Sequence, residues 1–207
     1  MKKITIIIFI FLLTGCTSYT ELNDLAIIKS IGIEYKNKEY ILYAEIIDKI
    51  NQDNLPETKV INVKSKNIQE LFSDIKLLVN KEIYLSHIDL IIISETLNNN
   101  NFEEIINFFL NNKEIRNDFL CIYATDIEKV LKESDYDEIE EIVSTNKDSK
   151  DIINVTFEEI IKDFLDKKKF KVSLFTYDSE IRFIGNILYN DNEIERINSN
   201  EKEENRE

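Results

Sequence analysis

The side chains that could do chemistry in this chain are few. Its 207 residues include one His and two Cys, beside 40 acidic and 26 basic residues. An enzyme needs a nucleophile beside a base, a cluster of metal ligands or a loop that cradles phosphate. His87 and Cys121 fall in different predicted elements, and three Gly are too few for a Gly-rich loop. We therefore expect a protein that is not an enzyme, with no catalytic residue, metal site or dissociable cofactor.

The other thiol, Cys16, follows a segment typical of a secretory signal peptide. Lys2 and Lys3 form a short basic region, and residues 4–13 are an apolar run without charge. A membrane-spanning helix needs about 20 apolar residues, whereas a signal peptide has an apolar region of about 7–15. Small residues then lead directly into Cys16. The sequence therefore predicts a signal peptide over residues 1–15.

Residues 13–16, Leu-Thr-Gly-Cys, resemble the lipobox of bacterial lipoproteins. The resemblance implies that the Cys16 thiol receives a diacylglycerol, that the leader is cut before it, and that Cys16 begins the mature chain; a further N-acyl group on Cys16 stays open. Each buried CH₂ contributes ~0.8 kcal/mol, and two acyl chains suffice for stable attachment. We expect a lipid anchor that does not span the membrane. The alternative is an uncleaved anchor with an incidental Cys.

Charge excludes several classes of partner. The formal net charge is −14, and loss of Lys2 and Lys3 with the leader makes the mature chain more negative. Binding to nucleic acid needs Lys and Arg against phosphate, and a polybasic grip on anionic lipid needs the same, so neither is expected. With Cys16 lipidated, Cys121 has no disulfide partner. It lies in an apolar run, which predicts a small buried side chain.

The apolar pattern predicts a mixed α/β (α+β) fold around a mixed sheet. Residues 25–35 and 40–47 form an opening antiparallel hairpin, and residues 59–66 a third strand. Capped helices alternate with strands after Asn67, which gives β-α-β-α-β-α crossovers, and the strand over residues 88–94 is apolar enough for a central position. A C-terminal helix and a partial β unit follow.

These elements suggest a division of the chain into segments. A lipidated tether covers residues 16–24, of which the eight after Cys16 reach at most about 28 Å. The remaining segments are an N-terminal mixed α/β domain over 25–133, an acidic linker over 134–151, a helix plus β-hairpin over 152–197 that starts a second domain, and a disordered tail over 198–207.

Several stretches, in order, resemble the C-subunit lipoproteins of GerA-type spore germinant receptors, the Ger(x)C family. They are residues 21–28 with 31–34, residues 84–87 leading into 90–95, and residues 113–116; residues 181–189 with Gly185 are a looser match. Such proteins are usually longer, with two further mixed α/β domains, so this chain resembles a short form covering mainly the N-terminal domain. Thr17, Ser18 and Tyr19 replace the usual Trp-bearing residues after the Cys.

The resemblance implies a lipoprotein needed for nutrient-triggered spore germination, held on the extracytoplasmic face of the spore inner membrane. It implies assembly with an A-type and a multi-spanning B-type receptor subunit, without catalysis. Beside the lipidated Cys16, the candidate interface or fold-critical residues are Glu21, Asn23, His87, Ser94 and Arg116. Two alternatives stay open: an extracytoplasmic solute-binding lipoprotein, which would need two lobes, and a cell-envelope hydrolase, which would need partners for His87.

Overall fold

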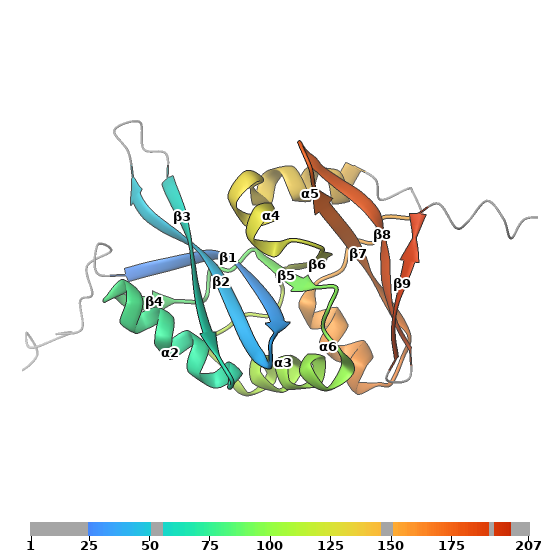
Figure 1. Cartoon of the computed structure of the whole chain (residues 1–207), viewed down its shortest axis with the longest axis horizontal. Helices are drawn as coiled ribbons and strands as arrows, with labels where there is room; N and C mark the ends of the chain where they lie inside the picture. The colour runs from blue at the N-terminus through green and yellow to red at the C-terminus, as the bar shows by residue number, and fades with distance from the viewer. Residues whose placement is uncertain (1–24, 51–55, 146–150, 191–192, 200–207) are drawn as a thin grey trace, which may run out of the picture.

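A nine-stranded mixed sheet runs through the whole molecule (Figure 1). The computed structural model describes residues 25–50, 56–145, 151–190 and 193–199. The strand order is β3-β2-β1-β5-β6-β7-β8-β9, and β4 pairs with β1 beside this path. The strands are β1 Leu25–Lys36, β2 Glu39–Ile50, β3 Pro56–Ser65, β4 Glu82–Tyr84, β5 Leu90–Ser94, β6 Leu120–Ala124, β7 Phe170–Tyr177, β8 Ile181–Asn190 and β9 Glu193–Asn198.

The kind of strand pairing changes twice across the sheet. β3, β2 and β1 are antiparallel, β1, β5, β6 and β7 are parallel, and β7, β8 and β9 are antiparallel again. Asn37 and Lys38 both have positive φ angles in the turn between β1 and β2, as a two-residue turn of type I′ requires. The expected opening hairpin, the parallel crossovers and the mixed α/β class are therefore confirmed.

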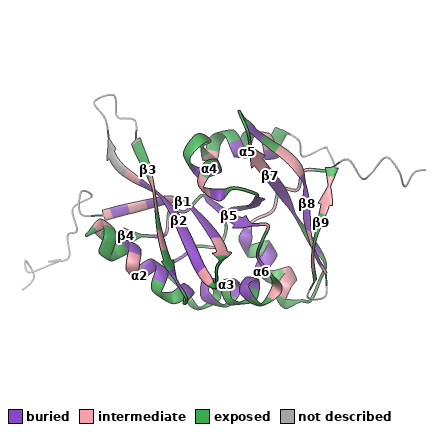
Figure 2. Cartoon of the chain, in the orientation of Figure 1, coloured by how far each residue is buried: buried purple, intermediate pink, exposed green. Residues whose placement is uncertain are grey.

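Five helices in the described ranges cover both faces of this sheet (Figure 1). They are α2 Ile68–Val79, α3 Asn99–Asn111, α4 Ile127–Glu133, α5 Tyr136–Thr145 and α6 Phe157–Leu165. One apolar core joins α2, α3 and α6 to the sheet, and a second core joins α4 and α5 to the opposite face. Figure 2 shows the buried residues concentrated on the strands and on the helix sides toward them. None of these helices is both long and apolar enough to cross a bilayer.

Side chains cap the helix starts, as the sequence analysis expected for the helices after Asn67. Thr156 and Glu159 form a reciprocal capping box at α6, and Asn67 caps α2 by accepting from the Gln69 N–H at 3.0 Å. Asn98 caps α3 by accepting from the Asn101 N–H at 3.1 Å. Asn101 lies inside that helix, where its side chain donates to the Tyr40 hydroxyl at 3.0 Å and so joins α3 to β2.

The structure differs from the expected acidic linker over residues 134–151. Most of this segment forms α5, whose Ile139 and Val143 are buried in the second core. Segment 152–197 does not stand apart either, because β7 pairs with β6 in the same sheet. The Ser173 hydroxyl also accepts from the Ile153 N–H at 2.7 Å. Of the expected tail, Asn198 ends β9; residues 200–207, and the proposed leader and tether over 1–24, lie outside the described residues.

Gly32 permits a close approach between α4 and the sheet. It is buried in β1, where a Cβ would overlap the Cγ2 methyl group of Ile127 in α4. Ile is stiff at χ1 in a helix, so this methyl group has little freedom to move away. The absence of a side chain at Gly32 therefore sets how near α4 lies to β1.

We expect Gly32→Ala to lower the free energy of unfolding by about 1–3 kcal/mol, the usual range for overpacking a core. Urea unfolding followed by circular dichroism measures the change. Ser30→Ala is the matched control in the same strand: its buried hydroxyl has no hydrogen-bond partner among the described residues, so stability should stay equal or rise. Equal stability of Gly32→Ala and the native chain would contradict this packing account.

Candidate functional site

Three of the residues singled out from the sequence can be placed in the fold. His87 and Arg116 line one pocket, while Ser94 lies at the opposite end of β5. Cys16, Glu21 and Asn23 lie outside the described residues. The structure therefore brings two of the candidate residues together and separates the third from them.

The site lies where the strand pairing along one side of β1 is interrupted. β4 pairs with Leu25 to Ile27, β5 pairs with Ser30 to Ile33, and residues 85–89 loop out between these two strands. β1 has an irregularity in register between Ile28 and Ser30. At that point the Lys29 carbonyl accepts from the Asp89 N–H at 2.8 Å. This bond holds Asp89 against β1, while Leu85 and Ile88 of the same loop are buried in the core.

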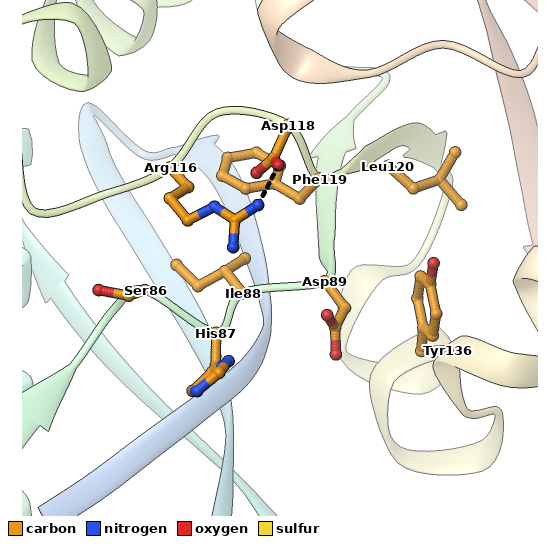
Figure 3. Close-up of a pocket in the computed structure, with 9 residues that line it drawn as sticks. All are labelled: Ser86, His87, Ile88, Asp89, Arg116, Asp118, Phe119, Leu120 and Tyr136. Carbon is orange, nitrogen blue, oxygen red and sulfur yellow. Dashed lines mark hydrogen bonds and ion pairs between the residues drawn. The ribbon is translucent and has the colours of Figure 1, made fainter.

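Two loops and one helix line the pocket (Figure 3). The loop before β5 provides residues 86–89, the loop before β6 provides Arg116, Asp118 and Phe119, and α5 provides Tyr136. The loops meet because β5 and β6 are parallel neighbours, so both strands begin at the same edge. The cavity volume is about 160 Å³, well below the ~300–1,000 Å³ of typical small-molecule sites. It fits the end of one side chain, or a few waters, better than a nutrient molecule.

The charged groups of the pocket are partly balanced. Arg116 and Asp118 form an ion pair, with side chains 67% and 49% exposed, and Figure 3 shows the guanidinium directed at that carboxylate. Partial burial raises the pKa of Asp89 above its ordinary 3.8, against the opposing charges of Lys29 and His87. Burial, and then the charges of Glu140 and Asp89, raise the pKa of Tyr136. The pocket is thus mostly polar, and its surroundings disfavour the ionised form of one carboxylate, that of Asp89.

The arrangement does not make a nucleophile and base pair. The His87 ring contacts the Tyr84 ring, with centroids 5.2 Å apart, and Ser86 donates its hydroxyl to the Glu114 carbonyl at 3.3 Å. In the described part of the chain, no group of three or more His, Cys, Asp or Glu could hold a metal ion. What the pocket offers is recognition by charge and hydrogen bonding.

Ser94 and Cys121 have positions within the fold itself. Ser94 is 3% exposed; its hydroxyl lies 2.8 Å from that of Thr96 and accepts from the Thr96 N–H at 3.2 Å, which ends β5 with a tight turn. Cys121 is fully buried in β6, and burial raises the pKa of its thiol. It is therefore the small unreactive core residue that the apolar run predicted.

Sequence reasoning missed Asp89, Asp118 and Tyr136. Asp118 follows Arg116 by two residues, so a closer look at that loop could have proposed the ion pair. Tyr136 fell in the segment expected as a linker, and only the packing of α5 brings it to the pocket.

Comparisons with known proteins define the class of this chain. Residues 18–177 match the family model of the spore germination protein N-terminal domain, and the chain belongs to that family. The match ends with β7. The family resemblance noted in the sequence is therefore confirmed.

Among curated proteins, the chain is similar to spore germination protein KC of Bacillus subtilis (strain 168). The two are 29% identical over an alignment of 148 residues, and the match covers 64% of this chain and 36% of that protein. The chain therefore matches only about a third of the length of this relative. No solved structure matches the chain.

We expect Asp89→Asn to stabilise the protein at neutral pH. The raised pKa of Asp89 means that folding disfavours its ionised form. Stability is therefore lost as pH rises through the folded-state pKa, and the loss is absent below the unfolded-state pKa. The gain from Asn should be present at about pH 7 and vanish toward about pH 4. Urea unfolding across this range measures it.

Asp118→Asn is the control for this measurement, since it breaks the ion pair with Arg116 and should give no gain at neutral pH. A gain from Asp89→Asn that does not change with pH, or no gain at any pH, would contradict the electrostatic account of the pocket.

Proposed function

We propose that this chain is a lipid-anchored subunit of a spore germinant receptor, needed for nutrient-triggered germination, which acts by assembling with other proteins and not by catalysis. The observation that carries the proposal is the family match, which begins at residue 18, two residues after the predicted lipidated Cys16. A leader, an acylated Cys and then the family domain is the order expected of an exported lipoprotein.

The proposed partners are an A-type subunit and a multi-spanning B-type subunit on the extracytoplasmic face of the spore inner membrane. The exposed pocket around His87 and Arg116 supports a role in assembly, because a recess of about 160 Å³ suits a partner side chain. Most of the side chains that line it are polar or charged, as at the rim of a protein interface.

Cys16→Ala should release the protein from membranes. Two acyl chains provide stable attachment, and the net charge of −14 gives no electrostatic substitute for them at an anionic surface. Fractionation of sporulating cells should move the variant to the soluble fraction, and its spores should respond poorly to nutrients. Mass spectrometry of the native mature chain should find diacylglycerol on Cys16.

The matched control is Cys121→Ala, which removes the other thiol and should leave the protein in the membrane fraction. Membrane retention of Cys16→Ala, or a native chain that keeps residues 1–15 without acyl groups, would contradict the proposal.

Arg116→Ala should weaken recovery of the A-type and B-type subunits in a pull-down from solubilised spore membranes. Arg182 on β8 offers a matched control, because it forms a similarly exposed ion pair with Asp178 in the turn before β8, away from the pocket. Exposed ion pairs contribute about 0–1 kcal/mol to stability, so neither variant should unfold. Equal recovery of both subunits with Arg116→Ala and Arg182→Ala would remove Arg116 from the interface.

A further inference from the structure

One line of apolar side chains crosses three strands near the start of β1. Ile27 in β1 lies directly opposite Tyr84 in β4 on one side and Ile47 in β2 on the other. Residues that lie opposite one another in a sheet project from the same face. Tyr84 is 37% exposed, and Ile27 and Ile47 are partly exposed. We call Ile27, Ile47 and Tyr84 the apolar row.

The apolar row lies on the face of the sheet that α4 and α5 cover elsewhere. The neighbouring residues Ile28, Ile46 and Ile83 pack in the core on the α2 side, so the row projects from the opposite face. Among the described residues, neither Ile27 nor Ile47 is part of either apolar core. Figure 1 shows α4 and α5 over the middle of the sheet, away from the first residues of β1. These two helices therefore leave the row uncovered.

An unpaired carboxylate lies beside the apolar row. Glu45 comes two residues before Ile47 in β2, so it projects from the same face about 7 Å away. Glu45 is only 5% exposed, and its carboxylate makes no hydrogen bond or ion pair within the part of the chain that the structure describes. A buried charge is costly unless an opposite charge meets it. The surface therefore favours a partner that brings a cation together with apolar side chains.

The apolar row also adjoins the pocket around His87 and Arg116. The His87 ring contacts Tyr84 at the end of the row, and Figure 3 shows Asp89 between His87 and Tyr136 of α5. A segment that covers the row therefore lies next to the pocket. The row spans two interstrand spacings, about 10 Å, which is the width of one helix.

We propose that the apolar row binds one amphipathic helix of a membrane-embedded receptor subunit, and that a Lys or Arg of this helix pairs with Glu45. The inference rests on the proposed function, and it identifies the surface used and the chemistry of the partner segment. Cys16 precedes Leu25 by nine residues, which reach at most about 30 Å, so lipid attached there keeps the row near the membrane surface. The net charge of −14 also favours a basic partner segment.

The first test is a photo-crosslink from the row, with the full lipidated chain in spore membranes. A photoreactive phenylalanine replaces Tyr84, or in the matched control Leu77, which is 78% exposed on α2 at the other side of the sheet. We expect position 84 alone to form an adduct with the A-type or B-type subunit. Mass spectrometry should place the adduct in a peptide with apolar residues at helical spacing and Lys or Arg beside them.

Several results of this crosslink would overturn the inference. They are adducts with lipid, with a second copy of the chain or with its own residues 17–24, equal adducts from positions 77 and 84, and no adduct from position 84. If the native chain still co-purifies with the subunits in these cases, the proposed function stands. If the native chain recovers neither subunit, the proposed function fails, and this inference with it.

The second test is Glu45→Gln, which removes the charge and keeps the shape of the side chain. Its stability in urea should equal or exceed that of the native chain, because a buried charge is lost. Recovery of the partner subunit in a pull-down should fall about tenfold or more, because the cation of the partner is left unpaired. Glu103→Gln, which removes an exposed carboxylate from α3, is the control and should leave recovery unchanged. Unchanged recovery with Glu45→Gln would overturn the inference.

Discussion

Every residue of β5 and β6 is buried, and this burial on two faces constrains the rest of the structure. A parallel strand in this position needs apolar cover above and below, so the connections that follow each strand must supply helices to both sides. α3 and α6 cover one face beside α2, while α4 and α5 cover the other. Gly32 allows α4 to approach β1 closely. The helices therefore pack at positions that the sheet determines.

Much of this architecture could be predicted because its signals are local. Alternation and apolar runs identified the strands, and polar caps such as Thr156 identified the helix starts. α5 was missed because its acidic first turn and its Ser and Asp neighbours suggested a linker. Tyr136, Ile139, Ile142 and Val143 are nevertheless spaced for one helix face and pack against the core. The place of residues 152–197 in the same sheet was missed for another reason. Parallel pairing of β6 with β7 joins distant segments and has no local sequence signature.

The candidate site, too, was partly predictable from local sequence and partly dependent on long-range contacts. His87 and Arg116 were selected by family resemblance, and they meet because each precedes one of two adjacent parallel strands. Ser94 is the last residue of β5 instead, so it lies at the end of the strand opposite the pocket. The raised pKa of Asp89 could not be foreseen, since it comes first from partial burial, which outweighs the opposing charge of Lys29 in β1, and then from Asp137 in α5. Family membership and fold class are thus accessible from local sequence, whereas the electrostatics of the pocket depend on long-range contacts.

β1 has a further property that matters for any protein attached through its N-terminal side. It pairs with β2 along one edge and with β4 and β5 along the other, so hydrogen bonds hold it on both sides from its first residues. A force that pulls on the chain ahead of Leu25 acts along this strand and is shared by many bonds at once, as in a shear joint. Peeling, which breaks bonds one after another, is avoided. Under the proposed anchoring at Cys16, the domain should therefore keep its shape when the membrane pulls on the chain.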